Sequence, residues 1–242
     1  MSWKSPSEVE ILQTIDGTWP AARTFATGPF TLRLGQDGGQ RVSAATATGS
    51  VDAAEIGAAE SAMRAMDQKR LFMITAKDTA LDAALKARGY AIKDPVTFFT
   101  APVNLLAQHK QKGMVAIRAT EPLEVMKEIW AAGQIGRGRL AVMARCKWPK
   151  TYLLGRVEDR AAGAAYVAMH GTTAMLHALE VLPEFRRKGL GLAMTAAAAA
   201  WATEQDATSF SLVTVTANKA ACGLYRQLGM TEAGHYHYRI KD

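Results

Sequence analysis

The sequence from residue 176 to residue 191 reads Leu176-His177-Ala178-Leu179-Glu180-Val181-Leu182-Pro183-Glu184-Phe185-Arg186-Arg187-Lys188-Gly189-Leu190-Gly191. The apolar residues before Pro183 predict a strand, and the residues after the glycines predict a helix. Glycines in such a turn let the backbone approach a ligand closely, and the free N–H groups of the first helical turn favour a phosphate. Cationic side chains beside the glycines would strengthen the same site. A basic turn that caps a helix without any ligand is the alternative.

Two familiar phosphate-binding loops do not fit this turn. The nucleoside-triphosphatase loop needs four residues between its glycines and then Lys-Ser or Lys-Thr, and the dinucleotide loop needs a third glycine where this chain has Met194. The remaining pattern, Arg-x-x-Gly-x-Gly after a strand ending in Leu-x-Val-x-Pro, closely resembles the acyl-CoA loop of the GNAT superfamily of N-acetyltransferases. Asn218 follows the next predicted strand, and Tyr225 lies seven residues later, ahead of Leu228-Gly229-Met230, in agreement with this resemblance. The resemblance covers residues 113–242.

The resemblance implies an α/β (α+β) fold, in which a mixed and mostly antiparallel sheet is flanked by helices. It also implies that acetyl-CoA is the acyl donor, and no metal is expected. Asn218 would contact the arm of the cosubstrate, and the main chain around Leu179 and Val181 would pair with the pantetheine. The pyrophosphate would be held by Arg186, Arg187, Lys188, Gly189, Leu190, Gly191 and Leu192.

The resemblance also implies a catalytic role for Tyr225. It would lie near the thioester sulfur and protonate the departing thiolate. A phenol suits that role because it is a neutral donor at pH 7, with a reference pKa of about 10. The alternative is an aromatic residue that only packs a helix against the core.

An amine must lose a proton before or during its attack on the thioester, and the sequence offers two candidate bases. His177 has a reference pKa near 6.5, and strand alternation predicts that it shares a face with Leu179 and Val181. Some amine acetyltransferases of the superfamily carry a histidine at this position. A strand histidine bonded to a backbone carbonyl is the alternative. Glu180 is predicted to point to the opposite face, and it competes as the base only if a bulge reorients it.

Periodicity and turn residues predict short strands and amphipathic helices throughout the second half of the chain. The predicted helices are Glu121–Ala132, 137–145, Leu190–Glu204 and Lys219–Leu228. The predicted strands are Met114–Arg118, Tyr152–Val157, Ala161–Met169, Thr173–Val181, Phe210–Val215 and Tyr236–Ile240. Short turns separate the strands between residues 152 and 181, which favours an antiparallel meander.

The first half ends in a segment similar to the end of the second half. Leu71–Ile74 is a predicted strand, and Thr79–Ala87 is a predicted helix that stops at Gly89. An offset of 140 residues aligns this segment with the end of the chain and places Leu85 opposite Tyr225. The pattern indicates an internal duplication, although a chance match of a common unit is the alternative.

The duplication predicts tandem acyl-CoA N-acyltransferase-like domains. The first half lacks an Arg-x-x-Gly-x-Gly turn, so residues 1–112 are expected to form a degenerate acetyltransferase-like domain that shapes the acceptor pocket or mediates assembly. Residues 113–242 would be the catalytic domain. The polar segment Gln108–Lys112 is the predicted boundary.

Other features of the first half are predicted to be structural. The glycine-rich segment Gly35–Arg41 is predicted to be a hairpin loop, because the runs on both sides, Thr31–Leu34 and Arg41–Thr46, look like strands. The aromatic residues expected in the core are Trp19, Phe98 and Phe99.

Composition and charge exclude several classes of protein. With 49% hydrophobic residues among 242, the chain can bury a core, and its two cysteines cannot staple a secreted scaffold. It has no apolar run near the roughly 18–20 residues that span a bilayer and no apolar signal sequence, so a cytoplasmic protein is expected. Of the formal charge of +7, residues 113–242 contribute +5. The only tight basic cluster, Arg186–Lys188, favours a small phosphate ligand over nucleic acid.

These features predict an N-acetyltransferase that moves an acetyl group from acetyl-CoA directly to a primary amine. The acceptor, a small-molecule amine or a peptide amine, is not identified by the sequence, and a homo-oligomer is left open. The alternatives are a catalytically weak acyl-CoA-binding sensor and a binding module associated with nucleic acid. A membrane is not expected among the partners.

Overall fold

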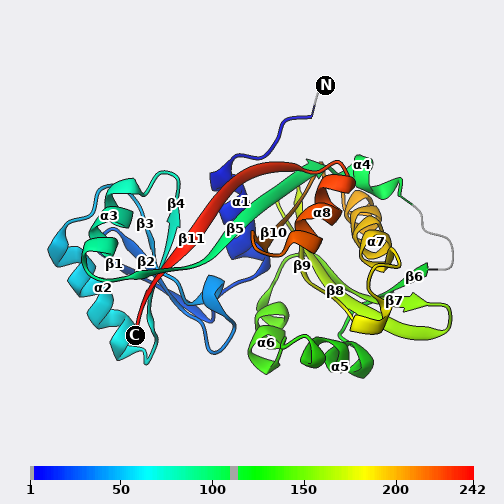
Figure 1. The fold of residues 1–242 in the computed structure, drawn as a ribbon, viewed down its shortest axis with the longest axis horizontal. Helices are drawn as coiled ribbons and strands as arrows, with labels where there is room; N and C mark the ends of the chain where they lie inside the picture. Colours follow the sequence, from blue (N-terminus) through cyan, green and yellow to red (C-terminus); the bar gives the residue numbers. More distant parts are fainter. Residues whose placement is uncertain (1–2, 110–113) are drawn as a thin grey trace.

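An eight-stranded sheet runs through most of the computed structural model, which describes residues 3–109 and 114–242. Its strand order is β4-β11-β5-β10-β9-β8-β7-β6, and a second sheet contains β1, β2 and β3 (Figure 1). The strands are β1 (Arg23–Thr27), β2 (Phe30–Leu34), β3 (Thr46–Ala47), β4 (Arg70–Thr75), β5 (Ala91–Pro102), β6 (Met114–Ala119), β7 (Lys150–Val157), β8 (Arg160–His170), β9 (Thr173–Val181), β10 (Ser209–Val215) and β11 (Thr231–Lys241). The helices are α1 (Glu8–Thr18), α2 (Ala53–Ala65), α3 (Thr79–Ala87), α4 (Val103–Ala107), α5 (Glu124–Ala132), α6 (Arg137–Arg145), α7 (Leu190–Glu204) and α8 (Lys219–Gln227).

The elements predicted for the second half are confirmed, and the mixed, mostly antiparallel sheet is the expected one. Helices α6 and α7 and strand β9 have the predicted bounds, and β7, β8 and β9 form the predicted antiparallel meander. The last strand is longer than predicted and begins at Thr231 instead of Tyr236. Its additional residues pair with β5, a strand from the other half of the chain that local patterning could not reveal.

The two halves of the chain exchange their last strands. Strand β5 lies between β10 and β11, and β11 lies between β5 and β4, with antiparallel pairing throughout. In Figure 1 these two long strands cross from one half of the molecule to the other. Each half therefore completes its sheet with a strand of its neighbour. Residues 110–112 of the predicted boundary lie outside the described residues.

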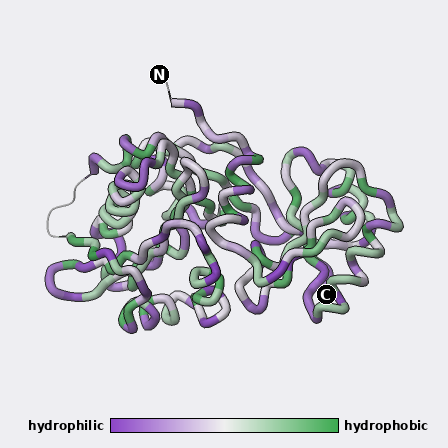
Figure 2. The backbone as a smooth tube through the Cα atoms, turned by 180° about the vertical axis from the view of Figure 1, so that it is seen from behind, coloured by the Kyte–Doolittle hydropathy of each residue, from purple (hydrophilic) through white to green (hydrophobic). Residues whose placement is uncertain are grey.

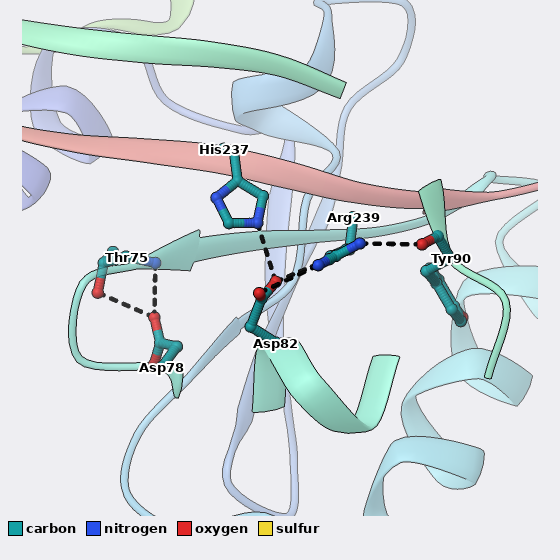
Figure 3. A network of polar contacts seen from close by, with 6 residues as sticks. All are labelled: Thr75, Asp78, Asp82, Tyr90, His237 and Arg239. Atoms are coloured by element: carbon teal, nitrogen blue, oxygen red, sulfur yellow. Dashed lines mark hydrogen bonds and ion pairs between the residues drawn. The ribbon is translucent and has the colours of Figure 1, made fainter. Parts of the chain in front are cut away.

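A charged cluster fastens β11 to α3 in the first half (Figure 3). The Arg239 guanidinium, 5% exposed, donates to both carboxylate oxygens of Asp82 at 2.7 and 3.0 Å and to the carbonyl of Tyr90 at 3.1 Å. The Nε2 atom of His237 lies 2.9 Å from the same carboxylate. Hydrogen bonding to Arg239 lowers the pKa of Asp82, so the carboxylate stays ionised against the arginine. The last strand of the chain is thus held in the first half by a paired, nearly buried charge.

The hairpin predicted around Gly35–Arg41 is wrong in its second arm. Residues 40–42 form a 3-10 turn, and only Thr46 and Ala47 pair with β2. The loop instead folds against α6, so closely that a Cβ atom at Gly38 would lie 2.5 Å from the side chain of Val142. The glycines therefore serve a contact between the two halves of the chain.

Helices α1 and α2 were missed by hydrophobic periodicity, although both carry a recognisable start signal. Ser7 with Glu10 and Asp52 with Glu55 form complete capping boxes, in which each side chain bonds the backbone N–H of the other residue. Helix α1 packs on the sheet beside β8 and β9, and it thereby brings residues of the first half to the centre of the second.

The main core lies under α7. Nine of the 15 residues of this helix are buried. Figure 2 shows the hydropathy of each described residue along the backbone. Of the three aromatic residues predicted for the core, Phe98 and Phe99 are fully buried and Trp19 is 2% exposed. In the part of the chain that the structure describes, we find no helix with the length and apolarity needed to cross a membrane.

Candidate active site

Strands β9 and β10 separate midway along their length and leave a cavity between them. Their parallel pairing runs only from Thr173–Ser209 to Leu176–Leu212, while β9 continues to Val181. The cavity has a volume of about 150 Å³. It brings together four of the predicted site residues, namely His177, Leu179, Asn218 and Tyr225.

A bulge in β9 changes which side chains face which side of the sheet. The pairing with β8 shifts between Ala164–Glu180 and Tyr166–His177, so β9 contains one extra residue, and Ala178 has a left-handed φ of 50°. The indole of Trp130 on α5 donates to the carbonyl of Ala178 at 2.8 Å and fixes the bulge. Trp130 lies within the helix predicted over Glu121–Ala132, and periodicity gives no sign of this contact with β9.

The predicted orientation of His177 is therefore wrong. Leu179 and Val181 pack against the core under α7, whereas His177 lies on the other face, stacked on Trp19 and Tyr166 at centroid distances of 5.0 and 5.8 Å. The extra residue reverses the alternation, because it shifts every later side chain by one position. For the same reason Glu180 lies on the same face as His177. This is the condition, a bulge in the strand, under which Glu180 was predicted to compete as the base.

His177 is 3% exposed and bonded at both ring nitrogens, in each case to a residue of the first half. Arg41 donates to Nδ1 at 3.1 Å, and Nε2 lies 2.8 Å from the hydroxyl of Thr18, which itself donates to the carbonyl of Thr14. This network assigns the ring as the neutral tautomer with its proton on Nε2. Burial, and then the charge on Arg41, place the pKa of His177 well below 6.5.

A buried neutral histidine makes stability depend on pH. Its pKa is lowered by folding, so below pH 6.5 the unfolded chain binds a proton that the folded chain does not. We expect the free energy of unfolding to fall by as much as about 1.4 kcal/mol per pH unit in that window from this residue. The free energy of unfolding can be measured by urea titration at several pH values on both sides of 6.5. Below pH 6.5 it should change less with pH for His177→Gln than for the wild type. The exposed-residue control His235→Gln should keep the wild-type slope; equal slopes in all three proteins would contradict the assignment.

Glu180 and Arg186 form a pair near the turn before α7. Glu180 Oε1 lies 3.0 Å from Arg186 Nη2, and the glutamate side chain is 20% exposed. Arg186 also donates from Nε to the carbonyl of Val181 at 2.9 Å. The other carboxylate oxygen lies only 2.5 Å from the position that a Cβ of Gly133 would take. The loop between α5 and α6 therefore packs closely against this glutamate.

The glycine-rich turn has the geometry of an open helix start. Gly189 precedes α7 with a left-handed φ of 90° and makes no side-chain cap, so the first N–H groups of the helix point out of it. Lys188 Nζ lies 5.4 Å from the centroid of the Phe185 ring. A Cβ at Gly191 would lie 3.1 Å from Leu224 on α8, which shows that this glycine serves the contact between the two helices. The turn is not part of the lining of the 150 Å³ cavity.

Asn218 and Tyr225 lie at the start and within the last turns of α8. Asn218 caps the helix, because its Oδ1 accepts from the N–H of Ala221 at 3.1 Å. The Tyr225 ring is 6% exposed and packs on Phe99 at a centroid distance of 5.6 Å. Burial raises the pKa of Tyr225, so its hydroxyl keeps its proton at neutral pH. Among the described residues this hydroxyl has no hydrogen-bond partner.

The described residues of the first half contain no counterpart of this arrangement. Leu85, which aligns with Tyr225, is fully buried in an apolar cluster, and it has no group that could transfer a proton. No cluster of three or more His, Cys, Asp or Glu residues that could hold a metal occurs within 3–109 and 114–242.

The comparisons with known proteins agree with the fold described above. Residues 123–230 match the model of the acetyltransferase (GNAT) family, whereas curated proteins gave no match. A GCN5-related N-acetyltransferase from Kribbella flavida superposes with a TM-score of 0.76 at 21% identity, over 98% of this chain and 96% of that one. A tandem GNAT protein from the clavulanic acid biosynthesis pathway has a TM-score of 0.63 at 14% identity, over 88% of this chain and 77% of that one. A conserved protein of unknown function from Staphylococcus epidermidis has a TM-score of 0.72 at 12% identity, over 92% of this chain and 94% of that one.

Proposed function

Because residues 123–230 form a GNAT-family domain, we propose that this protein transfers the acetyl group of acetyl-CoA directly to a primary amine. The observation that carries the proposal is the separation of β9 from β10, with Tyr225 facing the gap and an open helix start nearby. The degenerate first half would contribute to the acceptor side of this site and not to a second one.

The residues present fit acetyl-CoA. The free N–H groups from Arg187 to Leu192, beside the positive end of α7, suit a pyrophosphate, with Lys188 as an additional cation. The main chain of Leu179 and the N–H group of Val181 are no longer paired with β10 and could bind an extended amide-containing arm, whereas the carbonyl of Val181 accepts from Arg186. Asn218 borders the same gap.

Acetyl-CoA supplies the activated thioester, and the chain supplies proton transfer and orientation. Tyr225 holds a proton at Oη, near neutral pH, in an apolar setting where the hydroxyl has no competing acceptor. It would give that proton to the thiolate as the carbon–sulfur bond breaks, while the amine nitrogen forms the new bond to the acetyl carbon.

Glu180 is the better of the two candidate bases. The bulge turns its carboxylate to the face of His177, where it is 20% exposed and could accept a proton from the amine through water. A proton on His177 would place two cations side by side, because Arg41 donates to Nδ1. His177 then acts by positioning Arg41, and base catalysis by His177 stays the competing proposal. The variants Glu180→Gln and His177→Gln distinguish the two proposals. Only the variant that lacks the catalytic base should lose the limb of the pH–rate profile that reports the ionisation of that base.

Incubation with acetyl-CoA and a broad panel of amines, with detection of the released thiol, tests the proposed function. Amine-dependent thiol release by the full chain supports it. Tight binding of acetyl-CoA without release for any amine would instead favour a sensor. Binding of DNA without binding of acetyl-CoA would favour the nucleic-acid module.

We also propose a cytoplasmic location. Cys146 and Cys222 are both free and buried, as expected for a protein that folds where thiols stay reduced.

A further inference from the structure

A second cavity lies beside the first, between the two halves of the chain. Its volume is about 260 Å³, and it shares Arg41, Val213 and Thr214 with the lining of the first cavity. Drug-sized ligands usually occupy roughly 300–1,000 Å³, so this space suits a smaller molecule. It opens where an acceptor amine would have to approach the thioester.

Two arginines from different halves line this second cavity. Arg41 belongs to the loop between β2 and β3, and Arg139 belongs to α6. The loop and the helix interlock, because the side chain of Arg139 lies 3.5 Å from where a Cβ of Gly39 would be, and Gly138 packs on the carbonyl of Asp37. Gly39 has a left-handed φ of 95°, which lets the loop turn back toward the helix at this point.

Neither guanidinium is neutralised within the described residues. Arg41 lies over the ring of Trp19 at 4.9 Å and donates to neutral His177, and neither Arg41 nor Arg139 forms an ion pair there. The one carboxylate in the lining, Asp94, accepts from the amide of Gln40 at 2.8 Å and forms no ion pair with either arginine, so its charge leaves a net positive charge on the lining. The pKa of Arg139 is lowered mainly by its partial burial and, to a smaller extent, by the nearby charge of Arg41.

We propose that the acceptor is a small amine that carries an anionic group, either a carboxylate or a phosphate monoester, and that Arg41 and Arg139 bind this group. The inference rests on the proposed acetyl transfer. Guanidinium groups match carboxylate and phosphate oxygens in bidentate geometry, whereas a polycationic amine would be repelled from the same lining. With the anion held by the arginines, the amine is directed past Val213 and Thr214 toward the gap between β9 and β10.

Matched amine pairs test this proposal with the full chain and saturating acetyl-CoA. β-Alanine is compared with β-alaninamide, phosphoethanolamine with ethanolamine, and a polyamine serves as the cationic probe. We expect kcat/KM for the anionic member of at least one pair to exceed its neutral partner by about 10- to 100-fold, as for charge-assisted hydrogen bonds. The pair that shows the effect identifies the carboxylate or the phosphate. Equal or better use of the neutral or cationic amines overturns the proposal.

Variants on α6 isolate the role of Arg139. Arg139→Gln should raise the KM of the anionic amine about tenfold or more, with the KM of acetyl-CoA unchanged, and Arg139→Lys should restore part of the loss. Arg137→Gln removes another exposed arginine of the same helix that does not line the cavity, and it should have no effect. If Arg139→Gln leaves the preference for the anionic amine intact, the assignment of Arg139 is wrong.

Failure of the proposed function can be told apart from failure of this inference. If no amine releases thiol, the same amines are titrated by calorimetry into the protein saturated with CoA. Binding of the anionic amine that Arg139→Gln weakens would retain the pocket assignment although acetyl transfer fails. Absence of binding for every anionic amine would overturn it.

Discussion

Replacing Tyr225 with phenylalanine is expected to lower kcat about 100-fold or more, while the Kd for acetyl-CoA changes less than about threefold. General acid catalysis contributes typically 10²–10⁴-fold, and this substitution removes only the proton donor and keeps the packed ring. The ring would still rest on Phe99, so the gap between β9 and β10 should keep its shape. Steady-state kinetics combined with calorimetric titration of acetyl-CoA separates the two quantities.

A matched control comes from the first half. Tyr90→Phe also removes one hydroxyl, which donates to Glu60 at 2.9 Å far from the cavity, and it should leave kcat within about twofold of the wild type. Equal turnover in the Tyr225→Phe variant and the wild type would remove Tyr225 from the mechanism. A fall in acetyl-CoA affinity that accounts for the whole loss would assign Tyr225 to binding instead.

Replacing Gly189 with valine is expected to weaken acetyl-CoA binding about 100-fold or more. Gly189 has a φ of 90°, which a β-branched residue adopts only with strain, and the helix start that follows supplies the free N–H groups. Any rotation that relieves the strain moves those groups away from the pyrophosphate. The N–H donors and the positive end of the helix dipole would then no longer face the position proposed for the pyrophosphate.

Gly171→Val is the corresponding control for backbone strain. Gly171 also has a left-handed φ, of 57°, and a Cβ there meets nothing within 4 Å. We expect this variant to lose a similar amount of stability, about 1–3 kcal/mol, and to bind acetyl-CoA like the wild type. Equal loss of binding in both variants would show that Gly189 matters for folding alone.

Local sequence patterns predicted most helices and strands of the second half because the signals for these elements are local. The strand from Thr173 to Val181, the turn through Gly189 and the alanine-rich helix after it each depend on neighbouring residues, and the strand and the helix have the predicted bounds. Asn218 and Tyr225 could be placed together in the same way, since a strand and a helix of ordinary length bring them to one gap.

The remaining features depend on contacts between distant residues. The bulge at Ala178 is fixed by Trp130, 48 residues away, so alternation along β9 wrongly placed His177 on the face of Leu179 and Val181 and opposite Glu180. The strand exchange of β5 and β11 and the approach of Arg41 to His177 join the two halves of the chain and leave no periodic signal. Only the capping boxes of α1 and α2 were readable signals that hydrophobic periodicity alone overlooked.

Calorimetric titration of acetyl-CoA into the protein tests the central claim most directly. The claim is that the chain has one acyl-CoA site, built by β9, β10, α7 and α8, and that the degenerate first half has none. The account predicts one acetyl-CoA bound per chain, with binding lost in Gly189→Val and kept in Gly171→Val. Absence of binding to the wild type, or two molecules bound per chain, would contradict it.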